Sequence, residues 1–489
     1  MPSSLKEHIG KLLRQSAVYG VGHIVSRSLG FLLLPLYTNT IPTDDYGFAA
    51  VLFSFLGIMH VFYSYGMDVA YLRYVALQED VGKQKILFST GFISLLTSAI
   101  ILSVILILVR DKVSLMLFHT TGMSTLILLS AGILFFDCLA QLPFMALRAK
   151  QKSIQFASLK LVSVIINIGA NILFIVVLKN GVAGIFQANL VSSAITFVVV
   201  MPVFLRQFRL HFERGSYFEL IRFGLPYIPS GLAVVIMDMI DRIILERMAG
   251  AEVTGVYSAG YKLGMFMALF VAAFRFAWHP FFLSTSKQTN AKQVFGRVLT
   301  YFVLSCAFVF LLISLYVNDL VRIKIFGFTL FGEEYWGGTP VVPIIMISYI
   351  FYGIYVNFLV GIYLHNKTYY LPWVTGLAAL VNIIANFILI PPMGQLGAAW
   401  ATAIAYTTMA VFLYYRVRLL YPVPYEWLRI GKVAVVVLTI FILQIYIFQF
   451  EDILSKAIWM VLFFVLLWLS GFMKKSEKQY LRRILSRSR

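Results

Sequence analysis

The chain has 489 residues, of which 60% are hydrophobic and only 12% are charged, and its mean hydropathy is +0.87. Soluble domains carry roughly 25% charged residues, so this composition excludes a soluble globular protein and indicates an integral membrane protein. The formal net charge is +19, but no basic segment forms a folded domain with interleaved aromatic residues, and we therefore expect no nucleic-acid partner.

Long apolar runs recur from one end of the chain to the other. A membrane-spanning helix needs about 20 such residues, because the hydrocarbon core is about 30 Å thick and a helix rises about 1.5 Å per residue. The first run follows Lys6, Lys11 and Arg14 without a small-residue cleavage motif, so we interpret it as a membrane helix and not as a signal peptide. The sequence therefore predicts an all-α integral membrane protein with fourteen transmembrane helices, at residues 16–38, 47–66, 86–109, 122–146, 155–178, 182–205, 218–240, 254–282, 297–317, 340–364, 370–390, 395–415, 431–449 and 453–472.

The connections between these helices carry turn residues or charges, as in residues 42–45 (Pro-Thr-Asp-Asp) and 422–424 (Pro-Val-Pro). None of them is long enough to form a soluble domain. The longest, residues 318–339, is partly apolar, and we interpret it as a segment that lies on the membrane surface.

Residues 152–204 and 367–416 form an internal repeat. Duplicated bundles are common in transporters, whose substrate path lies between the two halves. We therefore expect two pseudo-symmetric six-helix lobes, residues 1–210 and 211–420, followed by two additional helices and a basic cytoplasmic tail in residues 421–489. The residues that recur, at a constant offset of 215, are Lys152 and Lys367, Asn167 and Asn382, and Asn171 and Asn386, and the copies continue into Gly-x-x-Gly at Gly181 and Gly184 and at Gly394 and Gly397.

The two asparagines of each copy lie four residues apart and so share one helix face. We interpret them as interhelical hydrogen-bonding residues in preference to substrate ligands. The glycine pairs permit a close approach of two helices or a sharp turn.

The distribution of Lys and Arg predicts the orientation, because positive residues are retained on the cytoplasmic side of a membrane. With both termini placed inside, the inner segments hold 29 of the 40 basic residues and the outer segments hold eight. The remaining three, Arg27, Lys262 and Arg275, fall within predicted spans. The sequence thus predicts a multi-pass protein with both termini in the cytoplasm, and much of the net charge is explained by this topology and by attraction to anionic lipid.

Charges within the bilayer are informative because each costs from about 2.5 to about 17 kcal/mol, depending on the method, unless it faces a cavity or a partner. Two interpretations of the three cations remain open. They can converge on a cavity for an anionic substrate such as a phosphate or pyrophosphate head group. Alternatively, each balances a buried acid. The residues that we consider for ion pairing or gating are Asp68, Asp137 and Asp238 within spans, with Arg27–Asp68 and Arg275–Asp137 as example pairs, and the Asp241–Arg242 pair near a predicted helix end.

Several stretches together resemble one family over essentially the whole chain, including the helix count. They lie at residues 26–31, 34–37, 44–47 and 66–74, and again at 241–242, 255–263 and 274–280. In their order and spacing they are similar to the bacterial polysaccharide transporters, the O-antigen flippase branch of the multidrug, oligosaccharidyl-lipid and polysaccharide exporter superfamily.

This resemblance implies a V-shaped, two-lobed bundle with two extra helices at the end. It also implies a cargo, an oligosaccharide repeat unit on a polyprenyl pyrophosphate, moved from the cytoplasmic to the outer leaflet by alternating access. The residues that the resemblance places along or beside the central cavity are Arg27, Arg73, Lys262 and Arg275. The related peptidoglycan-precursor flippases carry a further Arg-Asp pair late in the first helix, whereas Leu32, Leu33 and Leu34 stand here, which argues against that cargo.

Two other functions compete with this one. A drug antiporter of the same superfamily would share the architecture, but a cavity for cationic drugs favours carboxylates over the basic residues found here. A membrane polysaccharide polymerase or glycosyltransferase would normally need a large extramembrane loop with an acid or metal site. We therefore expect a transporter and not an enzyme.

The expected partners are the lipid-linked oligosaccharide and membrane lipid, with a polysaccharide polymerase and chain-length proteins as further candidates. We expect no cofactor, since the sequence contains no Gly-x-x-x-x-Gly-Lys-Ser/Thr motif for ATP. The expected location is the bacterial cytoplasmic (inner) membrane, in a pathway of cell-surface polysaccharide such as lipopolysaccharide O-antigen or exopolysaccharide.

Overall fold

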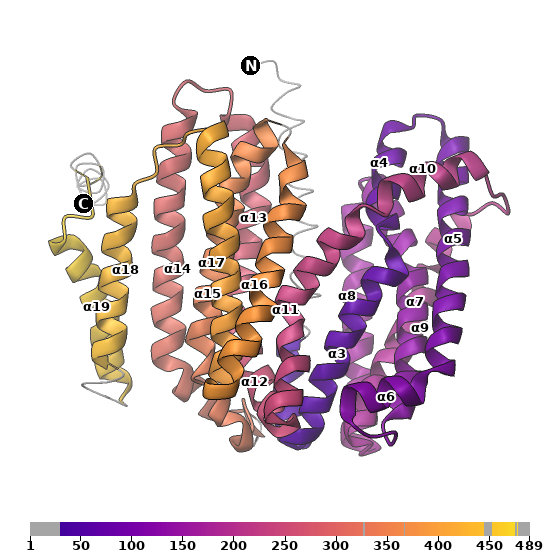
Figure 1. Cartoon of the computed structure of the whole chain (residues 1–489), viewed down its shortest axis with the longest axis horizontal. Coiled ribbons are helices and arrows are strands. Elements are labelled where there is room, and N and C mark those ends of the chain that lie inside the picture. Colours follow the sequence, from indigo (N-terminus) through magenta and orange to yellow (C-terminus); the bar gives the residue numbers. More distant parts are fainter. Residues whose placement is uncertain (1–29, 326–327, 366, 445–451, 475–476, 478–489) are drawn as a thin grey trace.

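The computed structural model describes residues 30–325, 328–365, 367–444, 452–474 and 477. Its helices gather into two bundles that lie side by side, with α11 running between them (Figure 1). The first bundle contains α2 (Leu34–Thr40), α3 (Thr43–Ser64), α4 (Met67–Leu77), α5 (Val81–Leu108), α6 (Arg110–Phe118), α7 (Ser124–Ala149), α8 (Ser153–Asn171) with its π-helical continuation η1 (Ile172–Val177), α9 (Gly181–Gln207) and α10 (Arg214–Gly224).

The second bundle follows after α11 (Tyr227–Ala249). It contains α12 (Ala251–Gly264), α13 (Phe266–Thr285), α14 (Ala291–Arg322), α15 (Val341–Leu364), α16 (Leu371–Met393) and α17 (Gln395–Leu420), with the short 3-10 helices η2 (Glu333–Gly338) and η3 (Thr368–Tyr370) and the two-residue strands β1 (Lys324–Ile325) and β2 (Phe328–Thr329). The last two helices, α18 (Trp427–Ile442) and α19 (Ile453–Leu469), lie beyond α14 on the outer side of this bundle (Figure 1).

Ten helical segments of the described chain are long and apolar enough to cross a membrane, and they coincide with ten of the fourteen predicted spans. Of the other four, α11 has 23 residues but carries several charges, α18 and α19 have 16 and 17 residues, and the predicted span at 16–38 lies mostly outside the described residues. The helical membrane architecture is therefore confirmed, while the number fourteen stays a prediction.

Bends lie at the end of one predicted span and within another. The span predicted at 47–66 continues as α4 after a bend at Tyr65 and Gly66, whose φ angles are +32° and +74°. The span predicted at 218–240 was wrong in its limits: it divides into α10 and α11 at Pro226, and α11 then extends to Ala249. A Cβ atom on Gly66 would lie 2.2 Å from the carbonyl oxygen of Gly224, so the two bends pack backbone to backbone within the first bundle, directly before α11 begins.

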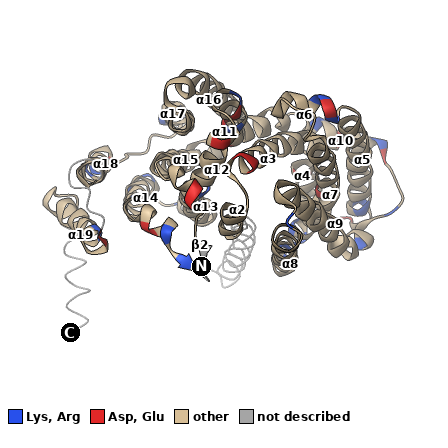
Figure 2. Ribbon diagram, turned by 90° about the horizontal axis from the view of Figure 1, so that it is seen from below, with Lys and Arg blue, Asp and Glu red and all other residues tan. Residues whose placement is uncertain are grey.

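The bundles meet closely at one end, where α3 crosses α12. A Cβ atom on Gly47 would lie 1.9 Å from the carbonyl oxygen of Ala251, and a Cβ on Gly255 would lie 1.9 Å from that of Thr43. Only glycine at these positions permits such an approach. Seen from this end, α2, α3, α11 and α12 lie between the two bundles (Figure 2).

The segment 318–339 packs against the first bundle. α14 extends to Arg322, and the following residues reach the first bundle. The Gly332 amide donates to Thr38 Oγ1 at 3.1 Å, and the Tyr335 hydroxyl donates to the carbonyl of Ile41 at 2.7 Å. The local sequence does not reveal these contacts with the other bundle, and the position of the segment at the membrane surface stays a prediction. The segment therefore adds to the contact between the bundles at the end where α3 crosses α12, which we call the closed end.

The internal repeat has the same local geometry in both bundles. In each copy the second asparagine donates its side-chain amide to the carbonyl of the first, at 2.8 Å for Asn171 and 2.9 Å for Asn386. The second glycine of each Gly-x-x-Gly then packs on the preceding helix. A Cβ on Gly184 would approach the carbonyl oxygen of Phe174 to 3.0 Å, and one on Gly397 would approach that of Leu389 to 2.1 Å.

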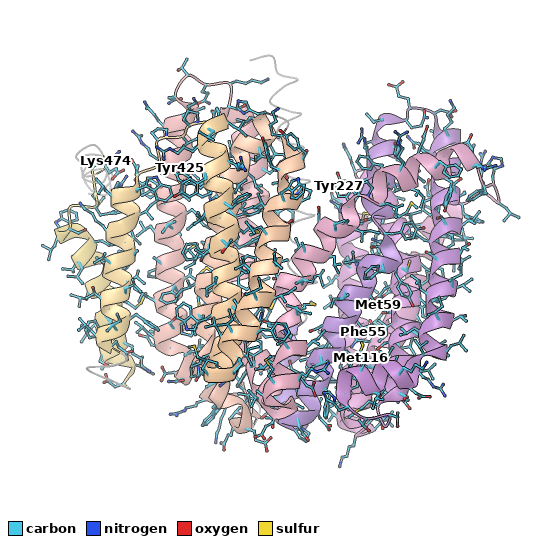
Figure 3. The ribbon with its side chains drawn as sticks, in the orientation of Figure 1. Phe55, Met59, Met116, Tyr227, Tyr425 and Lys474 are labelled. Atoms are coloured by element: carbon cyan, nitrogen blue, oxygen red, sulfur yellow. The ribbon has the colours of Figure 1, made fainter. Side chains whose placement is uncertain are left out.

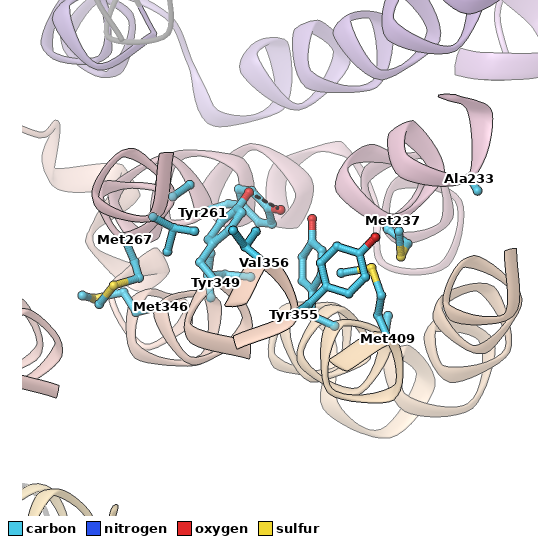
Figure 4. Packing of buried hydrophobic residues seen from close by; sticks show 14 of the residues in the cluster. Ala233, Met237, Tyr261, Met267, Met346, Tyr349, Tyr355, Val356 and Met409 are labelled. Carbon is cyan, nitrogen blue, oxygen red and sulfur yellow. Dashed lines mark hydrogen bonds between the residues drawn. The ribbon is translucent and has the colours of Figure 1, made fainter. Parts of the chain in front are cut away.

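The core of the second bundle is aromatic and methionine-rich. Met237, Tyr261, Tyr349 and Met409 come from α11, α12, α15 and α17 and are all nearly inaccessible. Figure 4 shows these side chains converging, with a hydrogen bond of 3.1 Å between the hydroxyls of Tyr261 and Tyr349. The helices that carry the charged residues described below are therefore held by a continuous apolar core.

The two C-terminal helices are attached by an ionic network at the end opposite the closed one, near Tyr425 and Lys474 (Figure 3). Arg429 donates to Glu426 at 2.7 Å and to Glu477 at 2.9 Å, and Lys474 also pairs with Glu426. Thr300 of α14 donates to Glu426 at 3.0 Å, which joins the network to the second bundle.

Candidate substrate cavity and charged clusters

A cavity of about 570 Å³ lies between the two bundles, away from the closed end. Leu72 of α4 and Arg148 of α7 line it from the first bundle. The opposite wall comes from α13 and α15 and includes Arg275, Trp278, His279 and Tyr363. α4 and α7 end within about two helical turns of Leu72 and Arg148, and α13 ends within about three turns of Arg275, so the cavity lies toward the open end of the gap between the bundles.

Two guanidinium groups therefore reach one cavity from opposite bundles. Arg275 donates from Nη1 to the hydroxyl of Tyr352 at 2.9 Å, and both Arg275 and Arg148 are exposed. Within the described ranges, neither arginine forms an ion pair with a carboxylate. The cavity thus has a cationic character together with aromatic walls.

Arg148 was not singled out in the sequence. It stands at the end of a predicted span, in a group of inner-loop basic residues, where cations are expected for topological reasons alone. Its position on α7 relative to α13 depends on how the bundles are arranged, so no local sequence signal identifies it.

Lys262 lies in a different place, at the contact between the bundles. Its Nζ is 5.5 Å from the ring centre of Tyr37 and 5.2 Å from that of Tyr46. Tyr37 in turn donates to Asn171 at 2.8 Å. Lys262 of α12 thus contacts two aromatic rings of the first bundle near the closed end, and it does not line the cavity described above.

The other predicted residues of the first bundle are scattered. Arg73 is exposed on α4, with its guanidinium 4.1 Å from the ring centre of Phe223 in α10. Asp68 is half-buried in the first turn of α4. Arg27, and with it the example pair Arg27–Asp68, lies outside the described residues.

Asp137 has partners within its own bundle and not across the gap. Ser193 of α9 donates a hydrogen bond to its carboxylate, and the charges of His60 in α3 and Lys160 in α8 act on it. Asp137 is surrounded by these helices but keeps an accessible surface. The example pair Arg275–Asp137 is therefore not formed here, since Arg275 is bonded to Tyr352 in the other bundle.

Lys160 is a second residue that the sequence analysis missed, because it was counted with the inner segments. The sequence held the necessary signal, since residue 160 falls within the span predicted at 155–178. In the structure Lys160 lies on α8, with its Nζ 4.0 Å from the ring centre of Phe144.

Asp238, Asp241 and Arg242 form a buried network inside the second bundle. Arg242 pairs with Asp241 at 2.7 Å, and its guanidinium carbon is 4.0 Å from the ring centre of Tyr261. Tyr257 donates to Asp241, and Tyr406 donates to Asp238. The pair does not lie near a helix end as predicted, because α11 continues for two further turns beyond it.

The described residues contain no group of three or more His, Cys, Asp or Glu side chains arranged to hold a metal ion. The polar side chains that line the cavity are those of Arg148, Arg275, His279 and Tyr363. Such donors favour an anionic ligand.

Together these features define a polytopic membrane protein with the two-bundle fold of known transporters. Over 96% of this chain and all of the compared chain, the fold resembles the lipid II flippase MurJ in an inward closed conformation, with a TM-score of 0.75 and 15% sequence identity. It also resembles the MATE transporter VcmN of Vibrio cholerae, with a TM-score of 0.60 and 15% identity over 85% of this chain and 97% of that one.

Residues 12–286 match the family described as polysaccharide biosynthesis protein, and the chain belongs to this family. The expected family resemblance is therefore confirmed. Among curated proteins, the chain is 22% identical to an uncharacterized membrane protein of Methanocaldococcus jannaschii over 435 residues, which cover 82% of this chain and 83% of the relative. It is also 22% identical to an Lsg locus protein of Haemophilus influenzae over 363 residues, 70% of this chain and 85% of that protein.

Proposed function

We propose that this protein is a flippase that moves a polyprenyl-pyrophosphate-linked oligosaccharide from the cytoplasmic to the outer leaflet, for the synthesis of a cell-surface polysaccharide. The observation that carries the proposal is the cavity between the bundles, which receives Arg148 from one side and Arg275 from the other. Membership of a polysaccharide biosynthesis family agrees with this cargo.

The chemistry of the cavity suits each part of such a cargo. A pyrophosphate accepts charge-assisted hydrogen bonds, and the planar guanidinium of arginine can bind it in a bidentate manner. Tyr363 lines the same cavity and is partly exposed, so it offers a flat apolar surface for a sugar ring. The polyprenyl tail is as apolar as the bilayer, so it can remain in lipid beside the gap while the polar head crosses.

The two ends of the molecule fit a transport cycle of alternating access. In this structure the bundles meet at the α3–α12 crossing and diverge toward the cavity. A rocking movement of one bundle against the other would open the closed end and close the end that holds the cavity. Since the basic inner segments lie at the cavity end, the conformation is the one that receives cargo from the cytoplasm.

This orientation has its own test. Arg110 begins α6 and Arg206 lies in the last turn of α9, and the positive-inside distribution assigns them to opposite sides. Single cysteines at these positions, in a background without the two native cysteines, should react with a membrane-impermeant maleimide in intact cells only at position 110. Labelling of both positions from the same side would overturn the proposed orientation.

The function itself is tested in proteoliposomes that contain a fluorescent polyprenyl-pyrophosphate oligosaccharide. Wild-type protein should make the inner-leaflet cargo accessible to an external quencher, and the Arg148→Ala/Arg275→Ala variant should not. Arg297→Ala is the matched control, since Arg297 is exposed on α14, away from the cavity. Wild-type proteoliposomes that move a cationic dye but not this cargo would overturn the proposal in favour of a drug transporter.

A further inference from the structure

The helix α10 and the segment before it lie across the cavity end of the first bundle (Figure 1). The segment is fixed to α5, because the Arg209 amide donates to Ser89 Oγ at 2.8 Å and the Glu213 amide donates to Thr90 Oγ1 at 3.1 Å. Leu220 of α10 is fully buried. One side of this segment is therefore firmly attached to the bundle.

Its other side exposes large apolar residues. Leu210 is 91% exposed, Phe212 is 46% exposed and Phe218 is 54% exposed. Three such side chains close together in sequence are unusual on a surface in water. At the end of a membrane protein, such residues are typical of a segment that inserts into the headgroup region of the bilayer.

Beside this segment is a cluster of three lysines, formed by Lys85 near the start of α5 and by Lys150 and Lys152 between α7 and α8. Lys150 donates to the buried side chain of Gln207 at 2.7 Å. Burial, and then the positive charges of Lys152 and Lys85, lower the pKa of Lys150. No carboxylate of the described chain pairs with Lys85, Lys150 or Lys152, so the cluster has a positive charge without a counterion.

We infer that this surface binds the headgroup of an anionic phospholipid of the cytoplasmic leaflet. The lipid phosphate would lie against Lys85, Lys150 and Lys152, while Leu210, Phe212 and Phe218 insert among the acyl chains below it. Charge complementarity and the neighbouring apolar residues both select a lipid, since a soluble anion would use only the lysines. The leaflet rests on the orientation proposed above, but the lipid site itself does not depend on the cargo.

The site has a mechanical consequence. α10 ends at Gly224, which packs on the bend at Gly66 of the first bundle and directly precedes α11, so a lipid that holds α10 at the membrane surface also holds the start of the helix that leads to the second bundle. Anionic lipid would thus fix the first bundle in the leaflet while the second bundle tilts.

The test compares the full-length protein in nanodiscs of dioleoylphosphatidylcholine with and without 30% dioleoylphosphatidylglycerol. We expect the anionic lipid to slow hydrogen–deuterium exchange in residues 205–224 and 148–153, and native mass spectrometry to show bound phosphatidylglycerol. The Lys85→Gln/Lys150→Gln/Lys152→Gln variant should bind this lipid about tenfold or more weakly, given that each surface lysine contributes to the attraction.

The matched control removes the same charge from the second bundle, as Lys287→Gln/Lys292→Gln/Arg297→Gln, and should bind the lipid like the wild type. Leu210→Ser/Phe218→Ser keeps the lysines and should lose exchange protection in both lipids. Equal protection of the wild type in the two lipids, equal loss in the control, or protection by inorganic phosphate in place of the lipid would each overturn the inference. Because no cargo is present, these outcomes are independent of whether the protein transports the proposed substrate.

Discussion

Arg148 and Arg275 line the same cavity from opposite bundles, and neither is paired with a carboxylate of the described chain. Each replacement by alanine should weaken binding of a polyprenyl pyrophosphate about ten- to a hundredfold, since a hydrogen bond to a charged group contributes about 1.5 to 3 kcal/mol. Arg275→Lys should restore binding only in part, because lysine lacks the bidentate fork. Affinities from native mass spectrometry measure this, and unchanged affinity in both alanine variants would remove the pyrophosphate from this cavity.

Lys262 should stabilise the closed end through the rings of Tyr37 and Tyr46. Cation–π contacts contribute about 0.5 to 2 kcal/mol, so Lys262→Gln should raise the open fraction of this end about two- to thirtyfold, whereas Lys262→Arg should change it little. Spin labels at positions 180 and 393, in a Cys138→Ala/Cys306→Ala background, report the separation of the bundles. The distance between the labels is measured by double electron–electron resonance spectroscopy. A distance distribution of Lys262→Gln that matches the wild type would show that the contact does not hold the end closed.

The bend at Gly66 should tolerate no side chain. Alanine there must adopt a φ of +74° and brings its Cβ to 2.2 Å from the Gly224 carbonyl, whereas Gly224→Ala meets atoms at 3.0 Å. We expect Gly66→Ala to destabilise the protein by about 2 to 4 kcal/mol and Gly224→Ala by less. Thermal unfolding followed by tryptophan fluorescence measures this. Gly169→Ala is the control, since it meets nothing within 4 Å, and an equal loss there would mean that the bend has no special role.

Asp137 should depend on Lys160 and not on Arg275. Lys160→Ala should destabilise the first bundle by about 1 to 3 kcal/mol, less than a fully buried pair because Asp137 keeps an accessible surface. Adding Asp137→Asn should recover part of that loss in thermal unfolding. The comparison pair is Arg275→Ala with and without Asp137→Asn, in which no recovery is expected. Recovery in that second pair alone would mean that Asp137 is balanced across the gap after all.

The attachment of α18 and α19 should weaken at low pH. Burial raises the pKa of Glu426, but hydrogen bonds from Lys474, Thr300 and Arg429 outweigh it and hold the pKa below its ordinary value of 4.5. A carboxylate whose pKa is lower in the folded state than in the unfolded chain stabilises the folded state at pH values above the pKa of the unfolded chain. This stabilisation is lost as the pH falls through the pKa of the folded state. Hydrogen exchange in residues 426–442, measured relative to the intrinsic exchange rate at each pH, should therefore be slow at neutral pH and accelerate below about pH 4.5.

In Glu426→Gln the same exchange should already be faster at neutral pH and should vary less with pH. Glu79→Gln removes an exposed carboxylate elsewhere and should behave as the wild type does. Exchange that is independent of pH in the wild type would contradict the role of this network.

Much of the architecture was accessible from the sequence because its signals are local. A run of about 20 apolar residues predicts a span wherever it occurs, and ten of the predicted spans appear as helices of sufficient length. The offset of 215 residues likewise predicted two related copies, and the paired asparagines and Gly-x-x-Gly turns have the same geometry in both. The stretches that resemble polysaccharide transporters also identified the family.

The partners of the intramembrane charges could not be read in this way. A charge within a span must find a partner or a cavity, but the sequence does not state which helix faces it. The charge of Lys160 acts on Asp137 within the first bundle, Arg275 bonds to Tyr352, and Lys262 lies over tyrosines of the other bundle. The suggested pairing of Arg275 with Asp137 is therefore not formed.

The sequence by itself thus determined the class of protein, most of its spans, its repeat and its family, because hydrophobic length and residue order are properties of the chain alone. Only the tertiary structure decided that Arg148 joins Arg275 at the cavity, that Lys262 lies at the closed end, and that the bends at Gly66 and Gly224 meet. The physical reason is that a contact between side chains depends on the packing angles of whole helices, and glycines at the crossing of two helices show their purpose only once the second helix is in place.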